Sequence, residues 1–270
     1  MEEPLLLEAP RSRSARARAR ATARSAAFRL VAFYALLLLF GLASFLWSAI
    51  GAALVHVLPR RLGEPLGLGV IRSGFRAFFA AAEATGVLRL HLAALDALPR
   101  GEPVVIAPNH PSLLDAAFVL SRVPGVICAA KSPLWNNLLL GGAVRLAGFV
   151  RNDSPTRLVR DAIRQLRSGR CFLIFPEGTR SSAWPVGPVK GGFALIAQRA
   201  GVSVQTVLIE TNSRFLGKGW PLFKRPQLPL VYRVSLGPRF AAAGDIAEFV
   251  DRVRHCYRRE LGAGGGDAER

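Results

Sequence analysis

Cysteine is scarce in this chain of 270 residues, and the three that occur, Cys128, Cys171 and Cys256, stand far apart. Their odd number and the absence of any CxxC pair argue against a disulfide framework and against a cysteine-ligated zinc site. Histidine is scarce as well, and none of the four histidines stands at a metal-binding spacing. We therefore expect no metal site and no bound cofactor.

Acidic residues are half as common as basic ones: 18 Asp and Glu face 36 Lys and Arg, for a formal net charge of +18. Residues 1–29 hold seven arginines and three glutamates, a net of +4, so most of the excess lies further along the chain. Such a charge attracts polyanionic partners, namely anionic lipid headgroups, phosphorylated substrates, an acidic carrier protein or nucleic acid. A hydrophobic content of 51% excludes a disordered polyelectrolyte.

Charge is missing altogether between Arg29 and Arg60. As one helix, residues 30–58 would be about 43 Å long at ~1.5 Å per residue, longer than the ~30 Å hydrocarbon core of a bilayer. The run is too long for a signal peptide and lacks a small-residue cleavage site, so we interpret it as a membrane segment. Because arginines flank it on both sides, we expect it to enter and return, or to lie within one leaflet, with Gly41 or Gly51 near the bend.

The regions on either side of this segment have their own patterns. Residues 1–29 are a basic flank that we predict to be disordered and to bind lipid headgroups, a nucleic-acid arm being the alternative. In the amphipathic connecting region, residues 59–86, apolar residues recur at i, i+3, i+4 and i+7, a helical stripe that packs on the bilayer surface or on the domain. The stripe consists of Phe75, Phe78, Phe79 and Ala82.

From residue 87 onward, short apolar runs alternate with helical stretches. Strands are predicted at 87–92, 104–107, 126–130, 148–151, 171–175, 202–209 and 228–236, and helices at 112–120, 154–169, 190–199 and 245–261. This alternation indicates an α/β fold, a single domain over residues 87–261 with a largely parallel or mixed sheet flanked by helices. An N-terminal membrane helix or helical hairpin precedes the domain, and residues 262–270 are predicted to be a disordered tail.

The first candidate for chemistry is His110, which falls in a turn after a predicted strand, with Asp115 in the first turns of the next helix. From a pre-helical turn the carboxylate can reach Nδ1 of the imidazole, fix its tautomer and leave Nε2 free as a base. Within one regular helix the two side chains would instead point about 140° apart. The alternative is that His110 caps the helix and Asp115 makes a surface contact.

A second block follows the buried strand at residues 171–175 and begins with Pro-Glu-Gly-Thr-Arg. The carboxyl end of a strand is where α/β sheets bind ligands. Gly178 lets the backbone approach an anion, Thr179 offers a hydroxyl donor, and Arg180 offers a two-pronged donor for phosphate. Glu177 can orient the arginine or accept a hydrogen bond from a substrate hydroxyl. The alternative is an ordinary polar turn.

Together the two blocks resemble the glycerolipid acyltransferase family, whose best-known members are 1-acylglycerol-3-phosphate O-acyltransferases. His110 and Asp115 match the family's NHxxxxD motif, and residues 175–180 match its FPEGTR motif. The resemblance covers about residues 85–210.

Two further blocks are similar to family blocks that are less specific. Gly-Phe-Val-Arg at residues 148–151 looks like the intervening block, and the resemblance implies that Arg151 faces the acceptor phosphate. Lys190 begins a segment similar to the family's lysine–glycine block, so it joins Glu177, Gly178, Thr179 and Arg180 as an expected acceptor-binding residue.

The resemblance implies direct acyl transfer without an acyl-enzyme: His110 deprotonates the acceptor hydroxyl, which attacks an acyl thioester. Ser112 is therefore expected to cap the helix rather than to act as a nucleophile. The implied donor is acyl-CoA or acyl carrier protein, and the implied acceptor is a lysophospholipid, foremost 1-acyl-sn-glycerol-3-phosphate. Because the lipids reside in the bilayer and the thioester comes from the cytoplasm, we expect a membrane enzyme of the bacterial inner-membrane type, with a cytoplasmic catalytic domain and no nucleic-acid partner.

Two other interpretations stay open. Residues 203–206, Ser-Val-Gln-Thr, replace a proline-containing strand that is usual in the family, and Pro111 follows the histidine. Both features favour another hydroxyl acceptor, such as a lyso-ornithine lipid or a specialised lipid headgroup. A non-catalytic, basic, membrane-anchored binding protein would explain the charge but not the paired motifs.

Overall fold

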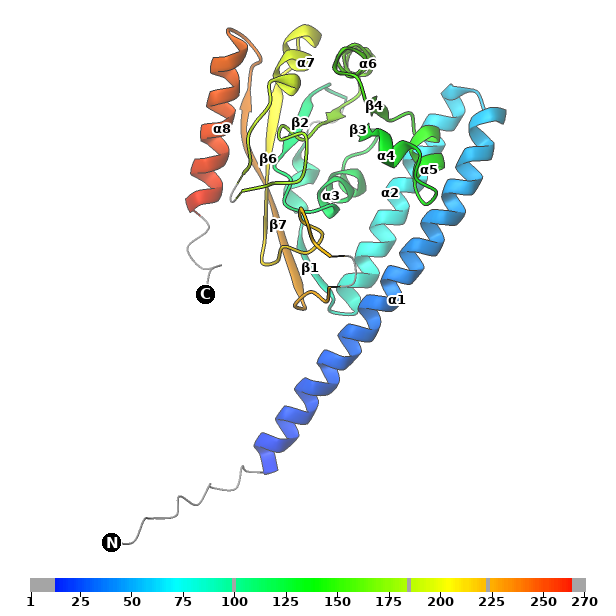
Figure 1. Ribbon diagram of the computed structural model, residues 1–270, viewed down its shortest axis with the longest axis vertical. Coiled ribbons are helices and arrows are strands. Elements are labelled where there is room, and N and C mark those ends of the chain that lie inside the picture. The colour runs from blue at the N-terminus through cyan, green and yellow to red at the C-terminus, as the bar shows by residue number, and fades with distance from the viewer. Residues whose placement is uncertain (1–12, 99–100, 184–185, 222–223, 264–270) are drawn as a thin grey trace.

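The computed structural model describes residues 13–98, 101–183, 186–221 and 224–263, and its centre is a seven-stranded sheet (Figure 1). The strands are β1 (Leu88–His91), β2 (Val105–Pro108), β3 (Ile127–Lys131), β4 (Val150–Asn152), β5 (Phe172–Leu173), β6 (Val204–Thr211) and β7 (Leu230–Phe240). Their spatial order is β1-β7-β6-β2-β5-β3-β4. Strands β2 to β6 run parallel, whereas β7 is antiparallel to β6 and parallel to β1. The predicted α/β class with a largely parallel, mixed sheet is confirmed.

Helices cover both faces of this sheet, because its central strands are apolar on both sides. Along β2, Ile106 faces the core formed with α1, α2 and α3, whereas Val105 and Ala107 face the core formed with α6, α7 and α8. Figure 1 shows α8 on one side of the sheet and α1, α2 and α3 on the other. The helical elements are α1 (Arg13–Val57), α2 (Arg60–Ala84), η1 (Ala93–Ala97), α3 (Leu114–Arg122), α4 (Ser132–Trp135), α5 (Gly141–Leu146), α6 (Pro155–Arg167), α7 (Gly192–Ala200) and α8 (Ile246–Ala263).

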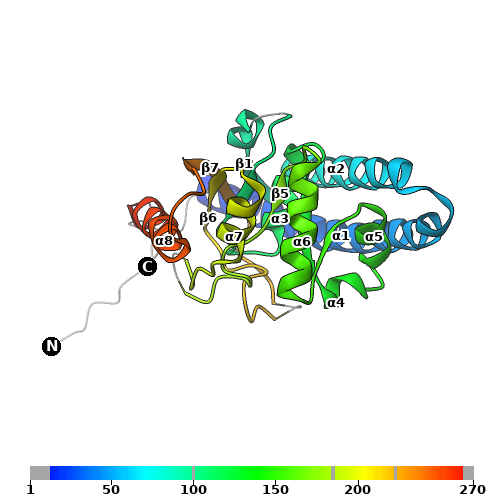
Figure 2. The same cartoon turned by 90° about the horizontal axis from the view of Figure 1, so that it is seen from above.

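The N-terminal hairpin consists of α1 and α2, which run side by side in Figure 2. The chain reverses at Leu58 and Pro59, so the expected bend at Gly41 or Gly51 is wrong. Gly51 instead lies inside α1, where a Cβ atom would stand 2.9 Å from the backbone of Gly142 in α5. Its lack of a side chain therefore permits close packing of two helices rather than a turn.

The boundaries at both ends differ from those predicted. Helix α1 already begins at Arg13, within the flank that we expected to be disordered, because this stretch is rich in alanine and arginine, which are strong helix formers. At the other end, α8 continues to Ala263, two residues into the predicted tail. Residues 1–12 and 264–270, which hold the rest of both predictions, lie outside the described residues.

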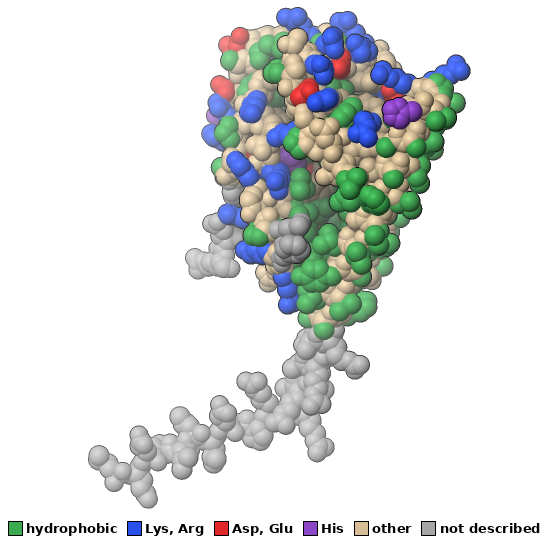
Figure 3. All heavy atoms as spheres, turned by 45° about the vertical axis from the view of Figure 1, so that its right-hand side comes forward, with side chains coloured by type: hydrophobic (Ala, Val, Ile, Leu, Met, Phe, Trp, Pro, Cys, Tyr) green, Lys and Arg blue, Asp and Glu red, His purple; other side chains and the backbone are tan. Residues whose placement is uncertain are grey.

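One face of α1 is buried against the domain and the other is exposed. The stretch Ser25–Val57 is long and apolar enough to cross a membrane: an 18-residue window within it has a mean hydropathy of 2.3, yet only 17% of that window is buried. We call its outward side the apolar face of α1; it appears as a green strip in Figure 3. Its exposed side chains are Phe28, Val31, Tyr34, Leu37, Leu38, Leu39, Leu42, Phe45, Leu46, Ile50 and Val57. This helix suggests association with a membrane.

The aromatic stripe of the connecting region packs on the domain, one of the two positions predicted for it. Phe79 and Ala82 are buried, and Phe75 and Phe78 pack against the same core cluster. All four lie on α2, which forms the inner arm of the hairpin and contacts α3. The inner arm therefore connects α1 to the helix that carries Asp115.

Candidate active site

The two predicted motifs meet at one edge of the sheet. Because β2 and β5 are parallel neighbours, the segments that follow them leave the sheet side by side. The Ser181 amide donates to the His110 carbonyl at 2.7 Å, and the His110 amide donates to Oε1 of Glu177 at 2.9 Å. Residues 67 positions apart in the sequence thus form one polar cluster.

His110 and Asp115 form the pair that the spacing predicted. Helix α3 begins only at Leu114, so His110 lies in the preceding turn, and its Nδ1 stands 2.9 Å from Oδ2 of Asp115. The carboxylate is fully buried, and the same oxygen accepts the amide of Ser112 at 2.7 Å. The imidazole also stacks on the ring of Phe175, with centroids 3.6 Å apart. Backbone, carboxylate and aromatic ring together fix the orientation of the imidazole.

Burial controls the protonation of this pair. The pKa of His110 is lowered from 6.5 to about 4, chiefly by desolvation; the charge of Glu177 raises this pKa, and the positive charges of Arg180 and Lys131 contribute to lowering it. Desolvation likewise raises the pKa of Asp115, whereas the amide of Ser112 favours its ionised form. Because Oδ2 already accepts this backbone N–H, we assign the shared proton to Nδ1 of His110. Nε2 then carries a free lone pair at neutral pH, as a general base requires.

Glu177, which we expected to bind the acceptor or to orient Arg180, is turned into the protein. Its carboxylate is buried and accepts from the amide of His110, from the hydroxyl of Ser181 at 2.7 Å, and from the amide of Gly187 at 2.7 Å. A buried carboxylate is stable only when such donors replace its water. It therefore holds the histidine turn against the second motif, and it directs its oxygens inward rather than to Arg180.

Gly178 and Lys190 come together beside this turn. Gly178 has a φ of +67°, in the left-handed region, and a Cβ atom there would lie 3.3 Å from the Nζ of Lys190. The backbone amide of Lys190 donates to the Pro176 carbonyl at 2.8 Å, and Thr179 is half-buried at the same turn. A cation, a hydroxyl and a bare backbone at one turn form a site suited to an anion.

Arg180 contacts a segment that the motifs do not include. Its Nη1 donates to the carbonyls of Leu216 at 3.0 Å and Gly217 at 2.7 Å, in the connection between β6 and β7. Leu216 has a φ of +55°, an unusual conformation for a leucine, which this guanidinium helps to maintain. One amino group of Arg180 is thus occupied by the protein.

Ser112 has a structural role, as predicted. Its Oγ accepts from the amide of Leu114 at 3.3 Å, at the start of α3, and donates to the Phe215 carbonyl at 3.0 Å. Tyr232 donates to the same Oγ at 3.3 Å. A hydroxyl with these partners, and none of them a base, is not an activated nucleophile.

Arg151 lies at the same edge but further out. It belongs to β4, and three strand spacings of ~4.8 Å, roughly 14 Å, separate β4 from β2. Its Nε forms an ion pair with Asp153 at 2.7 Å. The sheet order therefore does not bring Arg151 to the side of His110, and only a substrate that extends along the edge could contact both.

Sequence reasoning missed two residues of the cluster. Asn109 joins β2 to β6: its Nδ2 donates to the Ile209 carbonyl at 2.9 Å, and its Oδ1 accepts the Ile209 amide at 2.7 Å. Its place inside the NHxxxxD motif was an available signal. Lys131, the last residue of β3, acts on the His110 imidazole through its charge; a lysine directly after a predicted strand could have indicated this.

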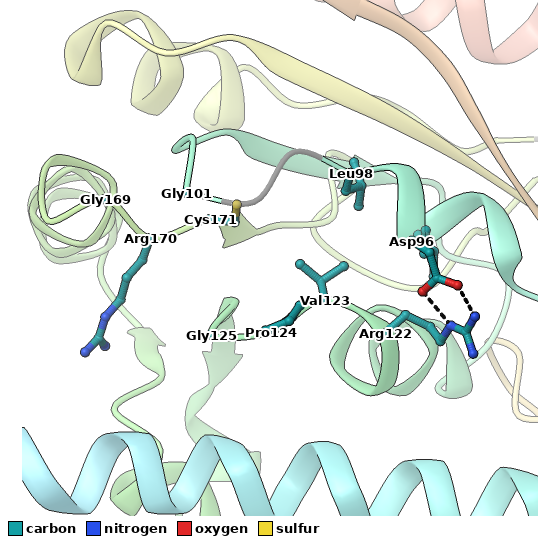
Figure 4. Close-up of a pocket in the computed structure, with 11 residues that line it drawn as sticks. Asp96, Leu98, Gly101, Arg122, Val123, Pro124, Gly125, Gly169, Arg170 and Cys171 are labelled. Carbon is teal, nitrogen blue, oxygen red and sulfur yellow. Dashed lines mark hydrogen bonds and ion pairs between the residues drawn. The ribbon is translucent and has the colours of Figure 1, made fainter.

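Two cavities in the described part of the chain lie away from this edge. One, of about 210 Å³, is lined by Gly125 and Cys171, which precede β3 and β5 at the opposite edge, and by the Asp96–Arg122 ion pair (Figure 4). The other, of about 540 Å³, lies between α2, β1 and α3 and includes His91. Neither contains His110, so we assign no part of the reaction to them.

Comparison with known proteins finds a family whose matching segment contains this cluster. The sequence model of the Acyltransferase family matches residues 89–210, which contain both motifs. Over these residues the chain is similar to the acyltransferase family. The segment matched begins in β1 and ends in β6, so it includes the cluster around His110.

Relatives in the family carry a common name. A 1-acyl-sn-glycerol-3-phosphate acyltransferase of Pseudomonas aeruginosa is 25% identical over 237 residues, which cover 84% of this chain and 88% of the relative. A chloroplastic 1-acyl-sn-glycerol-3-phosphate acyltransferase of Arabidopsis thaliana is 26% identical over 137 residues, 48% of this chain but only 38% of the relative.

A solved structure has the same fold. The 1-acyl-sn-glycerophosphate acyltransferase PlsC of Thermotoga maritima superposes with a TM-score of 0.63, covering 92% of this chain and 99% of its own, at 18% identity. Since this coverage extends beyond residues 89–210, the likeness includes part of the N-terminal hairpin as well as the sheet.

Proposed function

We propose that this acyltransferase moves a fatty acyl group from an acyl thioester to the free hydroxyl of a lysophospholipid, with 1-acyl-sn-glycerol-3-phosphate as the acceptor and acyl-CoA or acyl carrier protein as the donor. The observation that carries the proposal is the 2.9 Å contact between Nδ1 of His110 and buried Asp115, next to an anion-binding turn. The names of the relatives support the choice of acceptor.

In the proposed step, Nε2 of His110 takes the proton of the acceptor hydroxyl as its oxygen attacks the thioester carbonyl. Collapse of the tetrahedral intermediate breaks the carbon–sulfur bond, and the imidazolium returns the proton to the departing thiolate. Asp115 stabilises the transient imidazolium. The products are an ester and a free thiol, so atoms and charge balance without a cofactor.

The acceptor phosphate belongs, in this proposal, beside the left-handed turn at Gly178. Lys190 and the hydroxyl of Thr179 supply donors there, as do the nitrogens of Arg180 that do not contact the loop carbonyls. In this proposal Arg151 contacts the outer part of an extended substrate, such as the donor. Positive charge at this edge also favours the negative intermediate.

Membrane attachment through the apolar face of α1 fits this chemistry. An acceptor that resides in the bilayer must meet the histidine without leaving the lipid phase. Since α1 packs on the domain while its other face is exposed, the hairpin can enter a leaflet with the domain beside it. We place the domain on the cytoplasmic side of a bacterial-type inner membrane, where acyl thioesters are made.

The test is His110→Ala in purified protein, with thiol release followed against a panel of acceptors. General-base catalysis contributes roughly 10²–10⁴ in rate, so turnover should fall by that factor while folding and membrane attachment persist. His255→Ala is the matched control, because it removes an exposed histidine on α8. Turnover that is equal in the two variants would contradict the assigned base, and no turnover with any acceptor in the unsubstituted protein would favour a binding protein.

A second acceptor class was suggested by residues 203–206, and the structure gives these residues another explanation. Gln205 donates to the Gly237 carbonyl at 2.7 Å, and Thr206 to the Pro238 carbonyl at 2.7 Å, where the pairing of β6 with β7 shifts its register. The polar side chains satisfy that irregularity. The panel nevertheless includes a lyso-ornithine lipid, and thiol release with that lipid alone would replace the phosphate acceptor.

A further inference from the structure

The connection between β6 and β7 adjoins the catalytic edge without belonging to either motif. It leaves β6 at Thr211, and its residues 213–221, which we call the β6–β7 loop, contact the residues that follow His110. Besides the bonds to Arg180 and Ser112, the Leu216 carbonyl accepts the amide of Leu113 at 3.2 Å. The loop is therefore fastened to both motifs.

The same loop also contacts the N-terminal hairpin. The ring of Phe215 packs edge-on against Phe33 of α1, with centroids 5.5 Å apart, and against Trp220 at 5.8 Å. Phe33 is buried, whereas Val31 and Tyr34 on either side of it belong to the exposed apolar face of α1. The loop thus lies at the border of that face.

All charged side chains on this loop and in the residues after it, up to residue 229, are positive. Between residues 211 and 229 the sequence contains no Asp or Glu. Arg214, Lys218, Lys224 and Arg225 are exposed, and among the described residues none of the four forms an ion pair. Lys224 lies over the ring of Trp220, 5.0 Å from its centroid. These cations are consequently available to an external anion.

The arginines of α6 form another basic surface that could bind a polyanion. There, however, Asp153 lies 3.7 Å from Arg157, and Asp161 lies 3.0 Å from Arg160 and 3.5 Å from Arg164. Acidic partners therefore neutralise part of that surface. In addition, none of the exposed large hydrophobic side chains among the described residues lies on α6 itself.

We propose that the β6–β7 loop is a docking surface for the anionic headgroups of a bilayer, with Arg214 and Lys218 contacting lipid phosphates while the apolar face of α1 enters the leaflet. Cations border an exposed apolar strip on this side of the molecule (Figure 3). This order matches that of a membrane, where the anionic headgroups would contact the cations and the hydrocarbon would contact the apolar strip. This inference rests on the membrane attachment in the proposed function. It also brings the lipid surface next to His110, since the loop is bonded to the histidine turn.

The experiment compares the full chain with the double variant Arg214→Gln/Lys218→Gln in binding to vesicles. One set of vesicles contains phosphatidylcholine alone, and the other contains added phosphatidylglycerol. Each cation near an anionic surface strengthens binding roughly fivefold. The affinity of the double variant should therefore fall roughly 25-fold for anionic vesicles and little for neutral ones. High salt should remove most of this difference.

The matched control is Arg252→Gln/Arg258→Gln, which removes the same charge from α8, on the far side of the sheet from α1 (Figure 1). The affinity of the control for anionic vesicles should fall by less than about twofold if the loop itself is the contact. Equal losses in both double variants would overturn the proposal in favour of a general charge effect. Unchanged vesicle binding with a raised KM for an acyl-carrier thioester would also overturn it and indicate protein docking.

Acyl transfer is tested separately, by turnover of the unsubstituted protein in detergent micelles. Turnover there, together with unchanged vesicle binding of the loop variant, would reject the docking surface and keep the proposed function. Unfolding midpoints of both double variants verify that neither substitution disturbs the fold, because all four side chains are exposed.

Discussion

At the scale of single residues, burial determines what His110 can do. Its side chain is only 12% exposed, and the Asp115 carboxylate that it contacts is fully buried. Removing water favours the neutral imidazole, whereas the carboxylate and the amide of Ser112 orient it. The positive charges of Lys131 and Arg180 act in the same direction as burial. The imidazole is thus kept unprotonated without losing its orientation.

The first prediction concerns the pH dependence of kcat/KM. Protonation of His110 abolishes the base, and its pKa is lowered from 6.5 to about 4. Activity should therefore persist as the pH falls below 6.5 and be lost only as the pH approaches about 4. An acid limb near 6.5 in the measured profile would show that the group that titrates is not this buried imidazole.

Lys131→Gln provides the internal check on this profile. Because the ammonium of Lys131 lowers the pKa of His110, its removal should raise that pKa and move the acid limb to higher pH. A loss of activity with an unmoved limb would mean that Lys131 acts on the substrate alone.

At the scale of elements, the hairpin is attached to the domain by close contact of backbones. Small residues of α1 and α5 face one another where these helices cross, and the amide of Gly142 donates to Oγ of Ser48 at 2.9 Å. On α2, a Cβ at Gly67 would lie 2.7 Å from the amide nitrogen of Ala147. The crossing therefore requires glycine on both sides.

The second prediction tests this crossing with Gly142→Ala. A Cβ there would stand 1.8 Å from the Ser48 carbonyl oxygen, so the helices must separate, and the free energy of unfolding should fall by roughly 1–3 kcal/mol. Gly74→Ala is the matched control on α2, where a Cβ meets nothing within 4 Å, and it should stabilise by roughly 0.5–1 kcal/mol. Denaturant unfolding in detergent measures both, and equal effects would contradict the packing described.

At the scale of the whole molecule, charge and apolar surface are separated. The net charge is +18, yet Ser25–Val57 includes only Arg29 as a charged residue and leaves one face uncovered. Exposed apolar surface of this extent is costly in water and stable in contact with lipid. This distribution suggests that the exposed face of the helix associates with a membrane.

The third prediction is that the apolar face of α1 dominates attachment. Leu38, Leu42 and Leu46 are 65%, 59% and 62% exposed, so replacing all three with Ser should leave unfolding in detergent nearly unchanged. Burial of each leucine in lipid is worth roughly 1.5–3 kcal/mol, so vesicle partitioning should fall more than about 100-fold. Retention of the triple variant in the membrane fraction would mean that other surfaces suffice.

The sequence alone identified those elements whose pattern is contained within a short stretch of residues. The alternation of short strands and helices indicated the α/β sheet, and the charge-free run indicated the apolar helix. His110 and Asp115 were found because the sequence separation alone predicts their contact: with the histidine in the turn before the helix, a carboxylate five residues later can reach its ring. The extent of α1 and the turn at Pro59 were missed, since an arginine–alanine stretch and an internal glycine are compatible with both helix and irregular chain.

Tertiary structure alone decided which groups the active-site side chains contact. Glu177 faces the amide of His110, 67 residues away, and Arg180 faces the Leu216 carbonyl, 36 residues away. These contacts exist because the sheet places β5 beside β2 and turns the chain back from β6 into β7. The order of strands depends on how distant apolar faces pack, and no local period in the sequence specifies it.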